Sequence, residues 1–525
     1  MKGYFSLVLH SHLPFVKHPE HDYFLEEHWL FEAIIESYLP LLINLERLRQ
    51  ENVKVKLTLS LTPTLCEMLS DTHLQEKFTV HLNKLCELSV KECTRLDNDE
   101  VYREVAHFYR NRLESLRRFF TDDLQSNVLS GYRRFMEAGM VEIITCGATH
   151  GFLPLLSVNE QAVRVQIQAA VYTHEKYLGV RPKGIWLPEC AYYEGLDKLL
   201  SEAGIEFFFL ESHGLIYANP TPRFGLFAPV FTPCGVAAFG RDPESSRQVW
   251  SSISGYPGDP DYRDFYRDIG YDLEYEYIKP YICPDGTRVF TGLKYHRVTG
   301  QGEYKMVYKP QNAFNKAREH AENFHFNREK QIEHLSDYMD RPPLIVSPYD
   351  AELFGHWWFE GPEFIYHLFK TMDAHRVIEP IAPSEYLERY PTNQMVHPSP
   401  SSWGKDGYFD VWINQQNDWI YQHLHKMANT MQMLASRYRN ESNPLLRRAL
   451  DQMNRELLLA QASDWAFLIT TGTAVEYATK RTRTHIANFL KLSDMVENGA
   501  INEGVLRDLE NRHSLFEGIH FSIWK

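Results

Sequence analysis

The chain has 525 residues, 44% of them hydrophobic and 24% charged, which is typical of a globular protein with about two to four domains or with one large barrel and additions. Its net charge of −14 would repel the phosphates of nucleic acid, and no apolar run is long enough to cross a bilayer, so we expect neither a nucleic-acid nor a membrane partner. The seven cysteines form no CxxC pair and the N-terminus has no basic leader, which favours a cytoplasmic protein with free thiols.

Short apolar runs along the chain are predicted to be β-strands, each followed by turn residues and a helical pattern. Strands that alternate with helices indicate a mostly parallel sheet, and runs that are apolar on both faces indicate a sheet covered by helices. We therefore predict an α/β fold in which a (β/α) barrel carries the chemistry at the C-terminal ends of its strands. The seven predicted strands cover residues 4–9, 53–61, 141–145, 184–187, 205–210, 288–293 and 344–346.

Two regions interrupt this alternation. Residues 66–138 have a helical pattern throughout, so we expect an inserted helical subdomain there. The pattern is helical again from residue 396, where a segment rich in Pro and Ser marks a boundary. Residues 1–65 and 139–395 are thus expected to form the barrel, and residues 396–525 a helical C-terminal domain.

The longest segment without clear periodicity covers residues 241–281 and contains seven tyrosines. Irregular segments of this length in compact domains are often lids or binding loops. Tyr256, between Gly255 and Pro257, is predicted to lie at a turn tip and to act in such a lid. The alternative is that Tyr256 only packs the loop against the barrel.

Polar clusters follow four of the predicted strands directly, and two of them contain a candidate catalytic carboxylate. Glu189 and Asp350 each end an apolar run, so both are expected to face one crevice at the mouth of the barrel. Glycoside cleavage needs such a pair, one group to attack or stabilise the anomeric carbon and the other to protonate the leaving oxygen. Taken alone, either carboxylate could be a helix cap or a salt-bridge partner.

His10, His12 and His150 lie in the other two clusters and have a metal-binding alternative. Three histidines near a carboxylate can hold Zn²⁺, as in a metal-dependent deacetylase or a zinc mannosidase. The chain has no His-Glu-x-x-His pair, and no Asp adjoins the first two histidines. We therefore predict no metal and no cofactor, and expect these histidines to bind sugar hydroxyls and to set the protonation of the carboxylates.

Five segments resemble the ordered sequence blocks of glycoside hydrolase family 57, and they are most similar to those of its 1,4-α-glucan branching enzymes. They are HSHLP at residues 10–14, GATHGFLPLL at 147–156, WLPECAY at 186–192, PYDAELFGHWWFEGP at 348–362 and ASDWAF at 462–467. The resemblance implies a distorted TIM-like (β/α)7 barrel, a helical insertion and an all-helical C-terminal domain that completes the cleft. It also implies a retaining mechanism with Glu189 as nucleophile and Asp350 as general acid/base.

The same blocks contain candidate substrate-binding residues. Trp357 and Trp358 follow Asp350 closely and could equally belong to the core, whereas Trp403 in a polar loop is expected to stack on a sugar. Glu352 and Asp464 would raise the pKa of Asp350 by like-charge repulsion. Other candidates are Trp412 at the domain boundary, Trp465 in the last block, and Trp29, which the family comparison suggests.

The resemblance implies a branching enzyme that cleaves an α-1,4-glucan and transfers the chain to a 6-hydroxyl, with α-1,4-glucan as both donor and acceptor. An α-amylase or a 4-α-glucanotransferase of the same family shares the carboxylates and stays an alternative. From other classes, a metal-dependent deacetylase and a non-catalytic glucan-binding protein also remain open.

Overall fold

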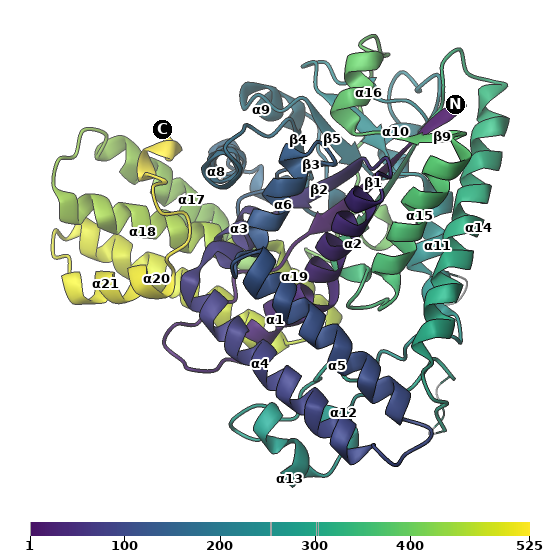
Figure 1. Ribbon diagram of the computed structural model, residues 1–525. Coiled ribbons are helices and arrows are strands. Elements are labelled where there is room, and N and C mark those ends of the chain that lie inside the picture. Colours follow the sequence, from purple (N-terminus) through teal and green to yellow (C-terminus); the bar gives the residue numbers. More distant parts are fainter. Residues whose placement is uncertain (1, 252–254, 301, 303) are drawn as a thin grey trace.

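Seven parallel strands form the centre of the molecule (Figure 1). They are β1 (Gly3–Ser11), β2 (Leu57–Leu61), β3 (Val141–Ile144), β4 (Gly184–Ile185), β5 (Phe207–Leu210), β7 (Ala237–Gly240) and β8 (Leu344–Asp350). β1 pairs with β2 and β8, β2 pairs with β3, and β5 pairs with β4 and β7. The computed structural model describes residues 2–251, 255–300, 302 and 304–525.

Backbone hydrogen bonds join these two groups of strands into one barrel. Beyond β3, the amide of Trp186 donates to the carbonyl of Thr145 at 2.8 Å. Beyond β7, the amide of Asp242 donates to the carbonyl of Val346 in β8 at 2.9 Å. The predicted (β/α)7 barrel is thereby confirmed. Two short strands lie at its margins, β6 (Val230–Phe231) antiparallel to β7 and β9 (Ile378–Pro380) beside the start of β1.

Alternate side chains of each strand point into the barrel. In β1, Tyr4 and Val8 belong to an inner apolar cluster, whereas Phe5 and Leu9 pack in the outer core with the surrounding helices. Because strand side chains alternate between the two faces, this register puts His10 at the top of the inner face. The sequence of β1 therefore places His10 at the mouth of the barrel.

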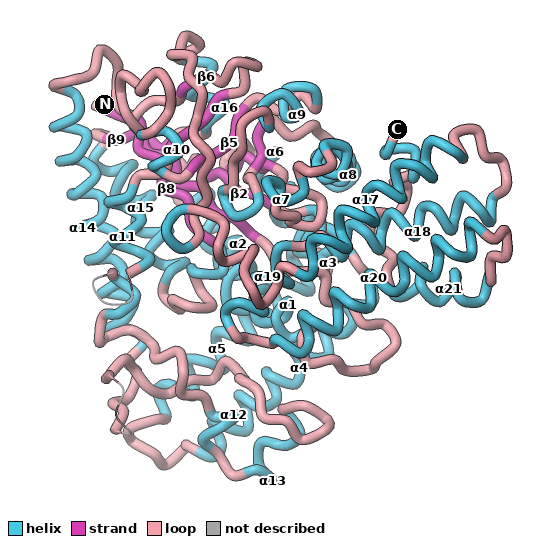
Figure 2. Tube along the Cα trace, turned by 180° about the vertical axis from the view of Figure 1, so that it is seen from behind, coloured by secondary structure: helices cyan, strands magenta, loops and turns pink. Residues whose placement is uncertain are grey.

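Helices cover the outside of the barrel (Figures 1 and 2). They are α1 (Glu27–Ala33), α2 (Leu39–Gln50), α3 (Pro63–Ser70), α6 (Val128–Glu137), α7 (Leu153–Leu156), α8 (Glu160–Leu178), α9 (Leu196–Glu202), α10 (Ser212–Ile216), α11 (Pro243–Trp250), α14 (Pro310–Ser336), α15 (Gly361–His375) and α16 (Pro383–Arg389). No helix among the described residues is both long and apolar enough to span a membrane.

One predicted strand is wrong. Residues 288–293 form no strand, because Gly292 has a φ of +79° and the amides of Thr291 and Gly292 donate to the carboxylate of Asp268 instead of to a neighbouring strand. The seventh parallel strand is β7, whose short Ala-Ala-Phe-Gly run has no β-branched residue and so gives a weak strand signal. The other six predicted strands are present with shifted ends.

A second lobe projects from one end of the barrel. It consists of α4 (Thr72–Arg95) and α5 (Arg103–Arg118), with the segment that carries α12 (Ile269–Asp272) and α13 (Tyr275–Ile278) beside them (Figures 1 and 2). The hydroxyls of Tyr277 and Tyr295 donate to the Glu92 carboxylate at 2.7 and 2.8 Å. Much of the predicted irregular segment 241–281 is therefore short helices and turns packed on this lobe, and its residues 252–254 lie outside the described residues.

The C-terminal helices form a bundle beside the barrel (Figure 1). They are α17 (Trp419–Arg437), α18 (Pro444–Ala460), α19 (Ser463–Thr471), α20 (Val475–Glu497) and α21 (Glu503–Arg512). At the junction of α18 and α19, the amide of Ser463 donates to the carbonyl of His150 at 3.0 Å, and the hydroxyl of Thr149 donates to the carbonyl of Leu458. This junction therefore lies against the loop that follows β3. The division of the chain at residues 66, 139 and 396 stays a prediction.

Candidate active site

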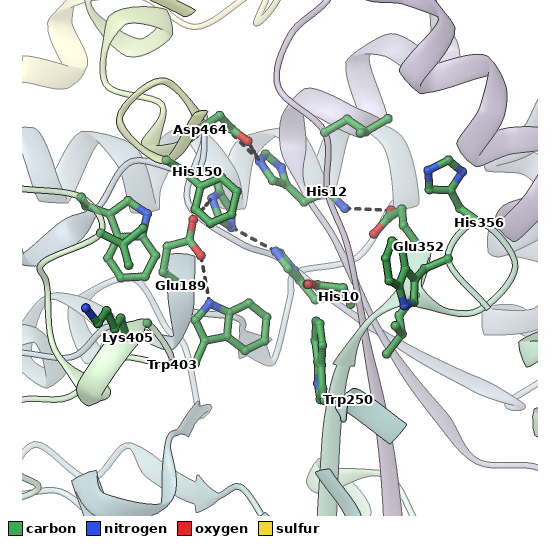
Figure 3. Close-up of a pocket in the computed structure, with 18 of the residues that line it drawn as sticks. His10, His12, His150, Glu189, Trp250, Glu352, His356, Trp403, Lys405 and Asp464 are labelled. Atoms are coloured by element: carbon green, nitrogen blue, oxygen red, sulfur yellow. Dashed lines mark hydrogen bonds and ion pairs between the residues drawn. The ribbon is translucent and has the colours of Figure 1, made fainter. Parts of the chain in front are cut away.

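A cavity of about 870 Å³ opens at the C-terminal ends of the barrel strands, where the C-terminal domain adjoins them (Figure 3). Both predicted catalytic carboxylates line this cavity, together with most of the predicted binding residues. The predicted residues that the structure brings together here are His10, His12, His150, Glu189, Asp350, Trp357, Trp403, Trp412 and Asp464.

Glu189 lies on a tight turn that directly follows β4. The backbone φ is 59° at Glu189 and 52° at Cys190, and residues other than glycine rarely adopt this conformation. The indole Nε1 of Trp403 donates to Oε2 at 2.9 Å, and the hydroxyl of Ser463 donates to Oε1 at 2.9 Å. Burial raises the pKa of Glu189, while these two donors act in the opposite direction and favour the carboxylate. The turn and the two donors fix the carboxylate in the cavity.

Asp350 ends β8, in register with His10 of β1. Burial raises the pKa of Asp350 to about 8, and the charges of Glu352 and Glu189 add to the shift. None of the described residues donates a hydrogen bond that would stabilise its charged form. Asp350 is therefore protonated at neutral pH, as a proton donor requires.

Glu352 lies beside Asp350 but has a different environment. Its Oε1 accepts hydrogen bonds from the hydroxyl of Tyr38 and from the amide of His12, the latter at 3.3 Å. Both donors hold the side chain in place. Glu352 therefore raises the pKa of Asp350 from a fixed position, as the sequence predicts.

A chain of hydrogen bonds leads from the barrel to Glu189, and Figure 3 shows its link between His10 and His150. An ionised carboxylate only accepts hydrogen bonds, so Ser463 donates to Glu189 and must accept from Nδ1 of His150, which lies 2.8 Å away. Nε2 of His150 is then an acceptor and receives Nε2–H of His10 at 3.0 Å. Nδ1 of His10 in turn accepts from the hydroxyl of Ser60 at 3.1 Å.

Both histidines of this chain are neutral. Burial holds the pKa of His10 and of His150 well below the usual range, and the neighbouring His12 lowers each further. Each neutral imidazole has one N–H donor and one acceptor nitrogen. Every hydrogen bond of the chain is therefore donated in the same direction, toward Glu189. We call the series Ser60, His10, His150 and Ser463 the histidine relay.

His12 differs from the other two histidines because one of its ring nitrogens is hydrogen-bonded directly to a carboxylate. Its Nε2 lies 2.9 and 3.1 Å from the two carboxylate oxygens of Asp464, and its Nδ1 lies 3.2 Å from the hydroxyl of Thr62. Burial alone would lower the pKa of His12, but the charge and the hydrogen bond of Asp464 raise it above the usual value. Asp464 therefore acts on His12, and Asp350 owes its raised pKa to burial and to other neighbours.

The donor atoms of these histidines form two groups that are close enough to hold a metal ion, but their ring nitrogens already take part in hydrogen bonds. His12, His150 and Asp464 approach one another within 4.8 Å, as do His10, Cys146 and His150. Each of the three imidazoles already has both nitrogens in hydrogen bonds, so a metal ion would have to break the relay or the contact with Asp464. The rings of His12 and His150 are also stacked, with their centroids 3.8 Å apart, so the nitrogens of the two rings lie in nearly parallel planes.

Indole rings form much of the apolar wall of the cavity. Trp357 is 41% exposed and packs on Phe265, with ring centroids 4.6 Å apart. Trp412 is buried against Phe152 and also lines the cavity. Sequence reasoning missed Trp250, which ends α11 with 40% exposure. It also missed Arg241, Lys405 and Phe467, which line the cavity too.

Four predicted residues do not line the cavity. Trp358 and Trp465 are buried in the core, and Trp29 meets Tyr477 edge to face at 5.7 Å. Tyr256 stacks on His320 of α14 at 4.4 Å, and its hydroxyl donates to Asn323 at 2.8 Å. Tyr256 thus has the packed position that the sequence left as an alternative to the lid.

Two family descriptions match the chain. Residues 6–341 match "Glycosyl hydrolase family 57", and residues 423–524 match "1,4-alpha-glucan branching enzyme, C-terminal". The first match runs from within β1 to just past α14 and so stops before β8, and the second covers most of the C-terminal bundle.

Several known proteins are similar to this chain over nearly its whole length, and their names give two different activities. The chain is 33% identical to a 1,4-alpha-glucan branching enzyme of Thermococcus kodakarensis, over 99% of this chain and 78% of that protein. Among solved structures, the alpha-amylase AmyC of Thermotoga maritima has a TM-score of 0.94 at 45% identity and covers 100% of this chain and 99% of its own. A GH57-type branching enzyme of Pyrococcus horikoshii has a TM-score of 0.90 at 33% identity, with 100% and 97% covered.

Proposed function

Since the chain belongs to glycosyl hydrolase family 57, we propose that it is a 1,4-α-glucan branching enzyme with α-1,4-glucan as donor and acceptor. The match of residues 423–524 to the C-terminal region of branching enzymes supports this activity. The observation that carries the reaction type is the pair of carboxyl groups in one cavity. Two donors favour the charged form of Glu189 against the effect of burial, whereas the raised pKa of Asp350 keeps it protonated.

The first half of the proposed reaction breaks an α-1,4 bond. An oxygen of Glu189 attacks the anomeric carbon, the bond to the leaving oxygen breaks, and Asp350 gives its proton to that oxygen. The products are a covalent glucosyl ester on Glu189 and a free glucan chain with a new 4-hydroxyl. Trp403 binds the other oxygen of Glu189 and so orients the attacking one.

The second half forms the branch. Asp350, now a carboxylate, takes the proton of an acceptor 6-hydroxyl, and the acceptor oxygen displaces Glu189 from the anomeric carbon. Each step inverts the anomeric carbon, so the product is an α-1,6 bond. The histidine relay supports both steps, because its last hydroxyl donates to Glu189 when the carboxylate is charged.

The walls of the cavity suit a glucan. Trp250 and Trp357 expose flat apolar rings, and the carboxylates and His12 surround them with polar groups. A sugar ring has apolar faces and hydroxyl edges, so indoles beside hydrogen-bonding groups match it. We assign the donor chain to this wall.

An α-amylase is the second candidate, because the chain is 45% identical to AmyC over its full length. Both reactions share the glucosyl ester and differ in whether water or a 6-hydroxyl reaches it. Amylose incubated with the protein and then treated with an α-1,6-specific debranching enzyme separates them. Under the proposal, debranching releases short chains from a polymer that had stayed long. Short linear products before debranching would favour the amylase.

A further inference from the structure

We propose that a second groove, next to the catalytic cavity, binds the acceptor glucan. This inference rests on the proposed branching function, because transfer between chains needs two glucans bound at once. The groove has a volume of about 460 Å³ and shares Trp403 and Gly404 with the catalytic cavity. Its other lining residues are Glu211, His213, Tyr217, Ser402, Asp406, Gly407 and Tyr408. We call it the Tyr217 groove.

The lining of the Tyr217 groove fits a neutral polyhydroxyl chain. Tyr217 is 69% exposed, and Tyr408 is 51% exposed although its ring meets that of His213 edge to face at 5.6 Å, so much of each ring is open to a ligand. Asp406 supplies an exposed carboxylate, which accepts hydrogen bonds from hydroxyls, whereas the carboxylate of Glu211 is already bound by Arg241 and Ser212. Exposed flat rings beside a hydrogen-bond acceptor match the faces and edges of a glucan.

Hydrogen bonds and a close backbone contact hold the groove's loop in place. Nε2–H of His213 donates to the carbonyl of Gly407 at 2.8 Å, and the amide of Ser402 donates to the same carbonyl at 2.9 Å. Gly407 has a φ of +82°, and a Cβ there would lie 2.6 Å from the ring of His213. Only glycine permits this close contact, which holds the 402–408 loop against α10.

The groove lies one side chain away from the nucleophile. The indole of Trp403 forms part of its wall, and the Nε1 of the same indole donates to Glu189 at 2.9 Å. Arg241 lines the catalytic cavity and pairs with Glu211 of the groove at 2.9 Å. Gly404 also lines both spaces and packs closely on the ring of Trp412, since a Cβ at this position would lie 2.5 Å from that ring. We infer that the 6-hydroxyl of a chain in the groove meets the ester on Glu189 along the wall that the two spaces share, at Trp403 and Gly404.

A transfer assay with separate donor and acceptor tests this assignment. α-Maltosyl fluoride supplies the glycosyl group, released fluoride reports the first half-reaction, and maltoheptaose is titrated as acceptor. For Tyr217→Ala and Tyr408→Ala we expect a larger effect on the acceptor than on the donor. The factor by which the KM for maltoheptaose rises should be about ten times the factor by which the rate of fluoride release falls. Tyr338→Ala is the matched control, because Tyr338 is 74% exposed and lies outside both spaces.

A binding measurement keeps the test independent of turnover. Calorimetric titration of maltoheptaose into Glu189→Gln should resolve a second, weaker binding event, which disappears when Tyr217→Ala and Tyr408→Ala are added. Retention of that event would overturn the inference. So would equal losses in fluoride release and in transfer, since the groove would then hold the donor. Failure of the branching proposal is a separate result, namely that the wild-type protein forms no α-1,6 bonds from amylose.

Discussion

Ser463 of the C-terminal domain donates a hydrogen bond to Glu189 of the barrel, with 2.9 Å between Oγ and Oε1. Two residues far apart in the sequence are therefore joined at the proposed catalytic site. The hydroxyl of Ser463 also accepts from His150, so the C-terminal domain completes the histidine relay. The proposed nucleophile is held correctly only when both parts of the chain are in place.

Replacement of Ser463 should shift the acidic limb of the pH profile. Ser463→Ala removes a donor to a charged carboxylate, a bond worth about 1.5–3 kcal/mol, so we expect a loss of about tenfold or more in kcat. Without the donor the pKa of Glu189 rises further, and the acidic limb of kcat/KM moves to higher pH. Ser463→Thr keeps the hydroxyl and serves as the control. An unchanged acidic limb in Ser463→Ala would remove Ser463 from the relay.

Asp350 should govern the alkaline limb. Because its pKa is about 8 and the reaction needs its proton, kcat/KM on amylose should fall as the pH rises through about 8. Asp350→Asn should nearly abolish activity on amylose but still form the glycosyl ester from a fluoride donor, whose leaving group needs no proton. Equal losses on both substrates would shift the acid role to Glu352.

The same pKa has a consequence for stability. The folded state raises the pKa of Asp350 above that of the unfolded chain, so the folded state loses stability as the pH rises through about 8. Asp350→Asn removes this titration. The variant should therefore gain thermal stability over the wild type at pH 9 and gain less at pH 5, as measured by calorimetry.

The strand-end rule found the two carboxylates from sequence. Glu189 and Asp350 each follow an apolar run, and the ends of parallel strands meet at one mouth of a barrel. The same rule failed for Arg241 because the short run of β7 was not recognised as a strand and residues 288–293 were taken instead. Ser463 was missed because no local pattern relates it to a residue 274 positions away.

Tyr256 should contribute to packing. Its ring stacks on His320 and its hydroxyl donates to Asn323, both in α14. Tyr256→Ala should lower the thermal midpoint and reduce branching and hydrolysis in parallel, whereas Tyr256→Phe should lose only the hydrogen bond, worth about 1 kcal/mol. A selective loss of branching with hydrolysis retained would instead favour the lid role that the sequence suggests.

Removal of metal should leave activity intact. Both nitrogens of His10, His12 and His150 are occupied by hydrogen bonds, so none is free to coordinate an ion. Prolonged dialysis against a chelator is therefore expected to preserve the rate on amylose. Stoichiometric bound zinc, with activity lost on its removal and regained on its return, would instead support a metal-dependent deacetylase or a zinc mannosidase.

In the proposed reaction, the glycosyl group bound to Glu189 is transferred to a 6-hydroxyl. Proton NMR of amylose after incubation measures this transfer directly, because α-1,6 anomeric signals and reducing ends are counted in one spectrum. The wild-type protein should produce α-1,6 signals with far fewer new reducing ends, and Glu189→Gln should produce neither, with a rate reduced by about 10⁴-fold or more. Reducing ends that accumulate without α-1,6 signals, or a variant that keeps a tenth of the activity, would contradict the account.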